Sequence, residues 1–446
     1  MITFFSAIVI LILGYFLYGR FVERTFGIDD SLQTPALALE DGVDYVPMNW
    51  KKIFLIQFLN IAGLGPIFGA IQGALFGPSA FLWIVFGTIF AGGVHDFLSG
   101  YLSLKNKGVS ASELVGIYLG ENARKIMVVF SVVLLVLVGV VFVTGPAGLL
   151  NSLTKVDTQI WVVVIFAYYI IATVLPIDKV IGKIYPLFGA ALILMAVGIA
   201  GGLFVTIACG AISGFHATQS PLMARCVEHE REIRPVFYGS MVAEGIIALI
   251  WAAAAMAFFH GEPQLQALYG STPAVGVQQM SVELLGPVGA ALAILGVVAC
   301  PITSGDTAFR SARLTIADSF SIKQESMKNR FMIAIPLFAV GIALTFIDFN
   351  IIWRYFAWSN QTLAMIMLWT GSMFLLKSNK NYFITAIPAI FMTVVTFSYI
   401  MQAPEGFKLS PEVGNGIGLV AGLILAVLFF NKVRKVKSES NKEHIA

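Results

Sequence analysis

The sequence predicts an all-α membrane protein with about thirteen transmembrane helices, and three observations support this fold class. First, 58% of the 446 residues are hydrophobic and only 12% are charged. Soluble domains carry about 25% charged residues, so lipid must be part of the solvent of this chain. Second, the chain contains a series of apolar stretches long enough to cross about 30 Å of hydrocarbon. Third, glycine and proline interrupt two of these stretches near their middle, which predicts two discontinuous helices.

The composition also excludes several classes of protein. A net charge of +3 gives no general attraction to nucleic acid, and three cysteines are too few for a disulfide framework. The sequence has no GxxxxGK[ST] phosphate loop, so an ATP-driven pump is not expected. It has no GxSxG or HExxH motif and no pair of aspartates at recognisable spacing, so no enzyme and no cofactor are expected.

The first apolar stretch, 2–18, has no basic residue before it and Arg20 just after it. It therefore lacks the charged start of a signal peptide, and we expect a retained extra helix over 1–20. A cytoplasmic loop is expected over 21–52. The twelve further candidate spans are 53–76, 80–103, 125–145, 159–175, 184–202, 203–221, 236–258, 286–318, 331–347, 351–376, 382–401 and 415–431.

The central spans form two groups of five, 53–202 and 203–376, and each group begins with an interrupted span. With an odd number of spans in each group, the second group enters the membrane from the side opposite to the first. This is the topology of an inverted repeat whose broken helices meet at a midplane binding site. Two extra helices over 377–431 and a basic cytoplasmic tail over 432–446 complete the predicted organisation.

The distribution of lysine and arginine predicts the orientation. With the N-terminus outside, 25 of the 28 basic residues fall on the inner side, and only Lys155, Arg354 and Lys408 fall on the outer side. Cytoplasmic flanks of spans are enriched in basic residues, so we expect a multi-pass protein of the plasma membrane with a cytoplasmic C-terminus.

The two interrupted spans contain Asn60-Ile-Ala-Gly-Leu-Gly-Pro66 and Ala208-Cys-Gly-Ala-Ile-Ser-Gly-Phe-His216. Broken helices persist at membrane depth where they line a cavity or are covered by protein, although small residues also allow close helix packing. Helix N-terminal ends favour an anionic group such as a carboxylate, and freed carbonyls favour a cation. The residues of the breaks expected to bind substrate are Gly63, Leu64, Gly65, Gly210, Ser213, Gly214 and His216.

Several longer motifs lie between residues 35 and 365. They are Pro35-Ala-Leu, Asp41-Gly-Val-Asp-Tyr-Val-Pro47, Ile61-Ala-Gly-Leu-Gly-Pro66, His95-Asp96-Phe97, Ile207-Ala-Cys-Gly-Ala-Ile-Ser-Gly-Phe-His-Ala217, Tyr238-Gly-Ser-Met with Glu244, Asp306-Thr-Ala-Phe-Arg-Ser-Ala-Arg313 and Trp358-Ser-Asn-Gln-Thr-Leu-Ala364. With these motifs the chain resembles the carbon starvation protein A family of membrane transporters. The resemblance implies uptake of peptides or of pyruvate, driven by a cation gradient. It also implies the LeuT-type fold, with a 5+5 inverted repeat.

In that fold an inner amphipathic segment follows the second core helix and an outer helical segment follows the seventh, which matches 109–120 and 260–285 here. The chain departs from the longer members of the family, because it lacks their large hydrophilic insertions. It also has Ile56-Gln57 where longer members carry paired histidines. The resemblance therefore does not fix the substrate.

Asp306 is the strongest candidate for coupling to a cation. An acidic residue inside a span costs at least about 2.5 kcal/mol on insertion scales, so it needs a partner or a use. In LeuT-type folds the equivalent helix supplies hydroxyls to a sodium site, a role open here to Thr303, Ser304 and Thr307. The alternative is a structural Asp306–Arg310 pair at i, i+4 near the inner surface.

Other polar residues in the spans are further candidates. Glu244 lies in apolar surroundings and is a candidate proton carrier, or a hydrogen-bonded or ion-paired group. Asp96, beside His95, either couples transport or caps an inner gate. The functional interpretation of His216 is that it binds an anionic substrate or relays a proton. The alternative is that it is a structural hydrogen-bonding group. Asn360 and Gln361, in the tenth core span, either close the substrate site or join helices. His95, Asp96 and His216 lack the spacing of a metal centre, so no metal is expected.

The sequence therefore favours a secondary active transporter that imports a small carboxylate or short peptides. Alternating access around the two broken helices would be coupled to a proton or sodium gradient. The alternative is a membrane sensor that binds a small carboxylate without moving it. Expected partners are the substrate, the coupling ion and membrane lipid. The oligomeric state stays open.

Overall fold

The computed structural model describes residues 2–42, 45–174, 212–259, 264, 273–320, 322–324 and 326–443. Within these residues the chain is helical, and an isolated β-bridge between Met48 and Val227 is the only strand-like pairing. This confirms the all-α class predicted from composition. The predicted span 184–202, residues 203–211 of the predicted span 203–221 and the candidate residue Gly210 lie outside the described residues.

The helices fall into two groups along the chain. The first repeat and its flanks contain α1 (Ile2–Phe26), α2 (Pro35–Ala38), α3 (Trp50–Ile61), η1 (Gly65–Gly69), α4 (Ala70–Gly73), η2 (Ala74–Phe76), α5 (Ser79–Gly87), η3 (Thr88–Gly92), α6 (Gly93–Lys105), α7 (Ala111–Leu119), α8 (Glu121–Thr154) and α9 (Thr158–Val174). The rest of the chain contains α11 (Phe215–Ala224), η4 (Glu230–Glu232), η5 (Arg234–Tyr238), α12 (Gly239–Phe258), α14 (Pro273–Ser319), α15 (Met327–Leu344), α16 (Phe349–Lys377), α17 (Phe383–Gln402) and α18 (Pro411–Glu443).

Many of these helices are long and apolar enough to cross a membrane. By length and composition, seven spans qualify among the described residues, and an eighth is the bent pair formed by Trp50–Ile61 and Gly65–Phe76. Long helices also cover the predicted spans 286–318 and 351–376, as α14 and α16. The chain is therefore a multi-pass membrane protein, while the total of thirteen spans stays a prediction.

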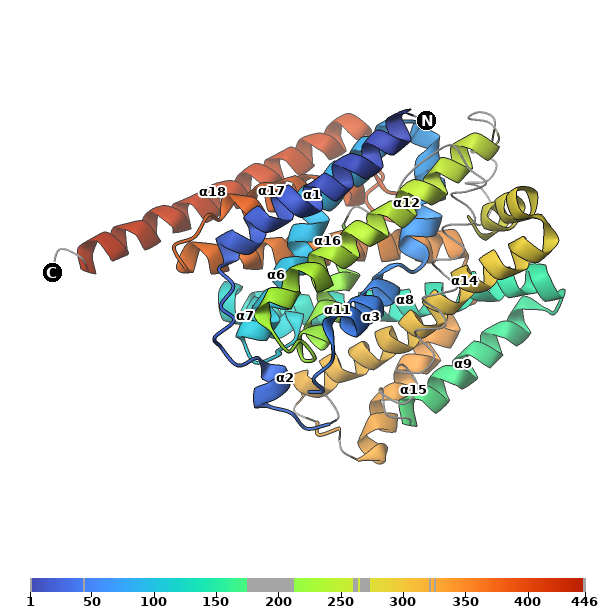
Figure 1. Cartoon of the computed structure of the whole chain (residues 1–446), viewed down its shortest axis with the longest axis horizontal. Coiled ribbons are helices and arrows are strands. Elements are labelled where there is room, and N and C mark those ends of the chain that lie inside the picture. Colours follow the sequence, from blue (N-terminus) through green and yellow to red (C-terminus); the bar gives the residue numbers. More distant parts are fainter. Residues whose placement is uncertain are drawn as a thin grey trace.

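The helices surround a central group of elements that carries the broken span. In Figure 1, α1, α17 and α18 lie along one side and α9 and α15 along the opposite side. Between them, α12 contacts α1, α3, η1 and α4, and α11 packs on α6 and α3. Apart from Ser240 and Glu244, the helix α12 is almost entirely apolar, and it is mostly buried, as expected for a helix in the middle of a bundle.

Small residues allow these helices to approach closely. A Cβ atom on Gly139 of α8 would lie 2.3 Å from the ring of Phe309 on α14. A Cβ atom on Gly100 of α6 would likewise lie 2.3 Å from the ring of Phe237 in η5. Since lipid tails are as apolar as leucine, such close packing is a main source of helix association in a membrane.

The first predicted break is present. The helix α3 ends at Ile61, and after a bend of 55° the chain continues as a π-helix from Gly65. Pro66 has no N–H and cannot continue an α-helical ladder, and the adjacent glycines add no side chain that would favour a continuous helix. The bend places the backbone of residues 62–64 inside the bundle, where Ala62 and Leu64 are fully buried.

A second interruption lies within α14. Gly286 has φ 66° and ψ 178°, which separates residues 273–285 from residues 287–319. A positive φ of this size is strained for residues with a Cβ atom, so glycine is the residue that suits this position. The first piece falls within the predicted outer segment 260–285, and the second matches the predicted span 286–318.

Ion pairs join the segment between α11 and α12 to α1, to the loop that follows α1 and to the end of α6. Glu230, which is 1% exposed, lies 2.5 Å from Lys105 Nζ and accepts a hydrogen bond from the backbone N–H of Asp29 at 2.9 Å. Arg231 pairs with Asp30 and Arg234 with Glu23, both at 2.9 Å. The basic members of these pairs all belong to the predicted inner side, so these contacts close that face of the molecule around the central helices.

The helix α7 lies within the predicted amphipathic segment 109–120. It begins after Ser110, whose hydroxyl accepts the backbone N–H of Glu113, and it buries Leu114 and Val115. Burial raises the pKa of the Glu113 carboxyl, and the nearby Asp318 adds to this rise. The segment is therefore packed on the protein along one face, as the spacing of its apolar residues predicts.

Candidate functional site

A cavity of about 500 Å³ lies at the break between α3 and η1. It extends from Ile61 and His216 in the interior to Phe76 and Ser79, which are exposed at the far end of the bent span. Its lining residues are Ile61, Gly65, Gly69, Gln72, Gly73, Phe76, Ser79, Ala80, Trp83, Phe142, Ile212, Ser213, Phe215, His216, Glu244, Trp353, Phe356, Ala357, Asn360 and Gln361. They are mostly apolar and aromatic with a few polar groups, which is the usual composition of a small-molecule site.

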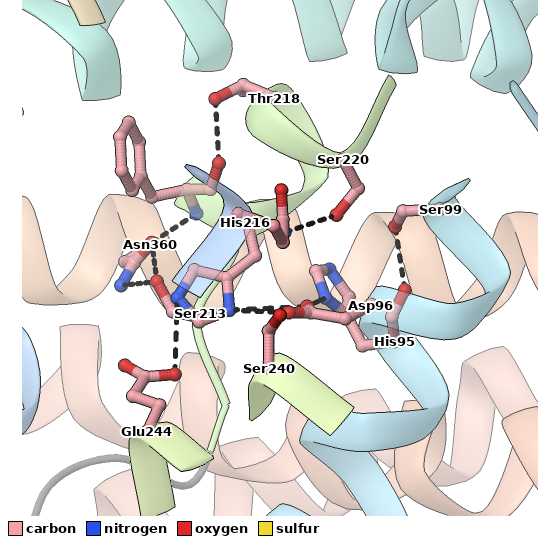
Figure 2. A network of polar contacts seen from close by, with 12 residues as sticks. His95, Asp96, Ser99, Ser213, His216, Thr218, Ser220, Ser240, Glu244 and Asn360 are labelled. Carbon is pink, nitrogen blue, oxygen red and sulfur yellow. Dashed lines mark hydrogen bonds and ion pairs between the residues drawn. The ribbon is translucent and has the colours of Figure 1, made fainter. Parts of the chain in front are cut away.

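Asn360 of α16 fixes the start of α11 beside the cavity. Its Oδ1 accepts the backbone N–H of Phe215 at 2.6 Å, and its Nδ2 donates to the hydroxyl of Ser213 at 2.8 Å. Its backbone carbonyl accepts the N–H of Gly214 at 3.1 Å. Figure 2 shows this side chain between Ser213 and the first turn of α11. Asn360 thus joins α16 to the start of α11 and also lines the cavity, while its part in substrate binding stays a prediction.

The first amides of α11 already have acceptors. Besides Phe215, His216 donates its N–H to the carbonyl of Ser213 at 3.2 Å, and Ala217 donates to Gly214 at 3.1 Å. The sequence argument expected free N–H groups at the breaks to receive a carboxylate. In the described part of the second break these three groups are occupied, so they are not a vacant anion site.

Four ionisable side chains form a buried chain next to the cavity. His216 Nδ1 lies 3.0 Å and 3.2 Å from the two oxygens of Asp96, and His95 Nδ1 lies 2.9 Å from Asp96 Oδ1. On the other side of the ring, His216 Nε2 lies 3.6 Å from Glu244 Oε2. All four residues are at most 2% exposed. Figure 2 shows His216 between the two carboxylates.

Three helices bring this group together. His95 and Asp96 begin α6, His216 lies in the first turn of α11, and Glu244 lies in α12. The α6 helix packs on α11, and the Ser99 hydroxyl donates to the His95 carbonyl at 2.7 Å one turn below. A carboxylate that receives one ring nitrogen of an imidazole fixes the orientation of that ring, so Asp96 directs the other nitrogen of His216 toward Glu244.

The predicted substrate-binding residues divide into two sets. Gly65, Ser213, His216 and Asn360 line the cavity. Gly63, Leu64 and Gly214 are packing positions in the structure. A Cβ atom on Gly63 would lie 2.8 Å from the Phe142 ring, one on Gly214 would lie 2.2 Å from the Asn360 carbonyl, and Leu64 lies against Gly145.

The predicted cation-coupling residues also lie in two places. Asp96 and Glu244 belong to the buried chain around His216, whereas Asp306 Oδ2 lies 3.5 Å from Arg310 on its own helix. Ser304 donates to the carbonyl of Leu59 in α3 at 3.2 Å, and Thr307 donates to the carbonyl of Thr303 at 3.0 Å. The Asp306–Arg310 pair that the sequence offered as an alternative is present, and Ser304 reaches the helix end that precedes the break.

Sequence reasoning missed part of the cavity wall. Trp353 Nε1 donates to Gln72 Oε1 at 2.8 Å, which joins α16 to α4 at one side of the cavity. Phe356 and Ala357 follow on the same helix face. Their spacing of three or four residues before Asn360 was the available signal, because residues i, i+3 and i+4 share a face.

No group of three or more His, Cys, Asp or Glu residues with the arrangement of a metal site occurs in the described ranges. The residues of the buried chain around His216 contact one another pairwise instead.

The comparison with known protein families decides the assignment. The family described as "Carbon starvation protein CstA" matches residues 1–152, 194–266 and 270–399 of the chain. The chain belongs to this CstA family. The resemblance inferred from the sequence motifs is therefore confirmed.

Curated relatives agree with this assignment. A protein from Campylobacter jejuni named "Peptide transporter CstA" is 24% identical and aligns over 94% of this chain and 82% of its own length. A Bacillus subtilis protein of the same name is also 24% identical, over 96% of both chains. An "Uncharacterized membrane protein" of Haemophilus influenzae is 42% identical over 60% of this chain and 93% of its own.

Solved structures confirm the LeuT-type fold of this CstA family member. A single-residue variant of a manganese transporter from Eremococcus coleocola superposes with a TM-score of 0.53 over 89% of this chain and 99% of its own. The sequence identity is 12%, so this likeness concerns the fold alone.

Proposed function

We propose that this protein is a secondary active transporter that imports short peptides or a small carboxylate. The observation that carries the proposal is the cavity at the break between α3 and η1, with polar groups from α11, α12 and α16 around it. Broken helices that line a cavity are the usual substrate site of transporters built on inverted repeats. The names of the Campylobacter and Bacillus relatives support a peptide as the substrate.

We further propose coupling to a proton or sodium gradient. Two groups of residues support it. One is the pair Asp96 and Glu244 on either side of His216. The other is Asp306 with the hydroxyls Thr303, Ser304 and Thr307, of which Ser304 already contacts the carbonyl of Leu59. Ionisable residues at membrane depth commonly serve ion pathways, because each is costly to bury without a use.

In this proposal the N-terminus is outside and the C-terminus is cytoplasmic, as the distribution of basic residues predicts. Alternating access would then open the inner face, where the Lys105–Glu230 and Arg234–Glu23 pairs lie. A sensor that binds the same ligands without moving them is the second candidate, and it would need the cavity but not this opening.

The test is uptake by the purified full chain in proteoliposomes. Labelled dialanine and labelled pyruvate are supplied outside under separately imposed proton and sodium gradients. We expect accumulation above the external concentration under one of the two gradients and none without a gradient. Binding of a ligand without accumulation under either gradient would contradict transport and favour the sensor. Empty liposomes under the same gradients are the control.

A further inference from the structure

The described part of the cavity wall offers a carboxyl group and hydrogen-bond acceptors, but no lysine or arginine. Among the described lining residues, Glu244 and His216 are the only ionisable side chains. Two side-chain oxygens in the lining, Glu244 Oε2 and Gln361 Oε1, are buried and have no hydrogen-bond partner. His216 Nε2 lies 3.6 Å from Glu244 Oε2. Buried polar groups normally have partners, so unpaired acceptors facing a cavity indicate a ligand that donates.

The ionisable groups around Glu244 also favour a ligand that donates hydrogen bonds. Two carboxyl groups share two imidazoles here: His95 and His216 both contact Asp96, and His216 also contacts Glu244. Among the described residues, no lysine or arginine pairs with either carboxyl group. A buried carboxylate is costly without a counter-charge, so a cationic group of the ligand beside Glu244 would stabilise the ionised carboxylate.

The size and the remaining polar groups of the cavity distinguish between ligands. A cavity of about 500 Å³ with aromatic walls from Trp353, Phe356 and Phe142 suits a molecule larger than a three-carbon keto acid. The amides of Phe215, His216 and Ala217, which would have received a carboxylate beside Glu244, are already occupied. A keto acid would thus bring its negative charge toward the Glu244 carboxylate, and no lysine or arginine among the described lining residues would receive it.

We propose that this cavity recognises its substrate through a protonated primary amine, with Glu244 as the receptor of the ammonium group. The inference rests on the proposed transport function and narrows its substrate to short peptides with a free amino terminus. Asp96 acts as a positioning residue, because it holds His216 through Nδ1 and so fixes the other wall of the ammonium site. An inorganic cation or a proton at Glu244 is the competing occupant.

The test compares dialanine with N-acetyl-dialanine and pyruvate, using the purified full chain in nanodiscs. Binding is followed by intrinsic fluorescence, since Trp83 and Trp353 line the cavity. We expect dialanine to bind at least tenfold more tightly than N-acetyl-dialanine, which has the same carboxylate but no ammonium group. Equal binding of the two peptides, tighter binding of pyruvate, or no binding of dialanine would overturn the proposal. This comparison needs no variant and does not depend on refolding.

A variant then assigns the effect to Glu244. Glu244→Gln should weaken dialanine binding at least tenfold and leave N-acetyl-dialanine unchanged, because only the ammonium contact is lost. The matched control is Glu121→Gln, which removes an exposed carboxylate on α8. If Glu244→Gln bound dialanine normally but its uptake no longer responded to a proton or sodium gradient, Glu244 would serve the coupling ion. That result would refute its role as receptor of the ammonium group. Failure of accumulation with intact discrimination between the peptides would refute transport alone.

Discussion

The Asp96 carboxyl group contacts two imidazole rings. One belongs to its sequence neighbour His95, and the other belongs to His216, which is more than a hundred residues away in the sequence. The sequence could nominate Asp96, His216 and Glu244 singly, because an ionisable residue in a span is rare and needs a use. It could not show that they touch. Their contacts depend on how α6, α11 and α12 pack, and no local pattern in the sequence records that packing.

These contacts predict strong energetic coupling between Asp96 and His216. Breaking a buried ion pair by changing one partner costs about 3–5 kcal/mol, since the other partner is left unpaired. Asp96→Asn and His216→Gln should therefore each lower the free energy of unfolding in mixed micelles. The double variant should cost less than the sum of the two by about 0.5–3 kcal/mol.

The control for this cycle combines Asp96→Asn with Glu121→Gln, whose carboxylate is exposed and pairs with Arg124. That combination should be additive. An additive Asp96–His216 cycle would mean that the imidazole and the carboxylate do not depend on each other in the folded protein.

At the scale of helices, the sequence predicted the break between α3 and η1, but it did not predict the turn at Gly286 inside α14. Gly63, Gly65 and Pro66 disrupt a helix by local chemistry, so the break between α3 and η1 could be read directly. The turn at Gly286 depends on one backbone conformation, and the sequence showed only a boundary between an outer segment and a span. Two of the predicted substrate residues, Gly63 and Gly214, lie against neighbouring helices, and their sequence motif does not show which neighbour each glycine faces.

The positive φ of Gly286 predicts a specific cost for alanine. A Cβ atom there would meet nothing within 4 Å, so the whole effect should come from backbone strain, of order 1–3 kcal/mol. We expect Gly286→Ala to lower the unfolding temperature of the detergent-solubilised protein. Gly148→Ala on α8 is the matched control, because that glycine also has open space but no positive φ. Equal unfolding temperatures of the two variants would show that a side chain at position 286 causes no backbone strain.

At the scale of the whole molecule, the cavity and the ion pairs lie at different depths of the same bundle. The cavity reaches the exposed residues Phe76 and Ser79 at one end of the bent span. Toward the other end, Gln57 donates to the Ser220 hydroxyl at 3.1 Å, and both residues are fully buried. Beyond them lies the buried Glu230 with Lys105. The proposed transport cycle therefore requires the Gln57–Ser220 contact and the ion pairs to open when the substrate leaves on the inner side.

The central claim is that substrate passes through the cavity at the first break, and filling that cavity tests it most directly. Gly65 lines the cavity and a Cβ atom there meets nothing within 4 Å, so Gly65→Leu should fill the space without backbone strain. Gly148→Leu, in a separate cavity of about 290 Å³, is the control. The measurement is gradient-driven accumulation of dialanine in proteoliposomes with equal amounts of folded protein. We predict at least a tenfold loss for Gly65→Leu and near-normal uptake for Gly148→Leu; normal uptake by Gly65→Leu would contradict the account.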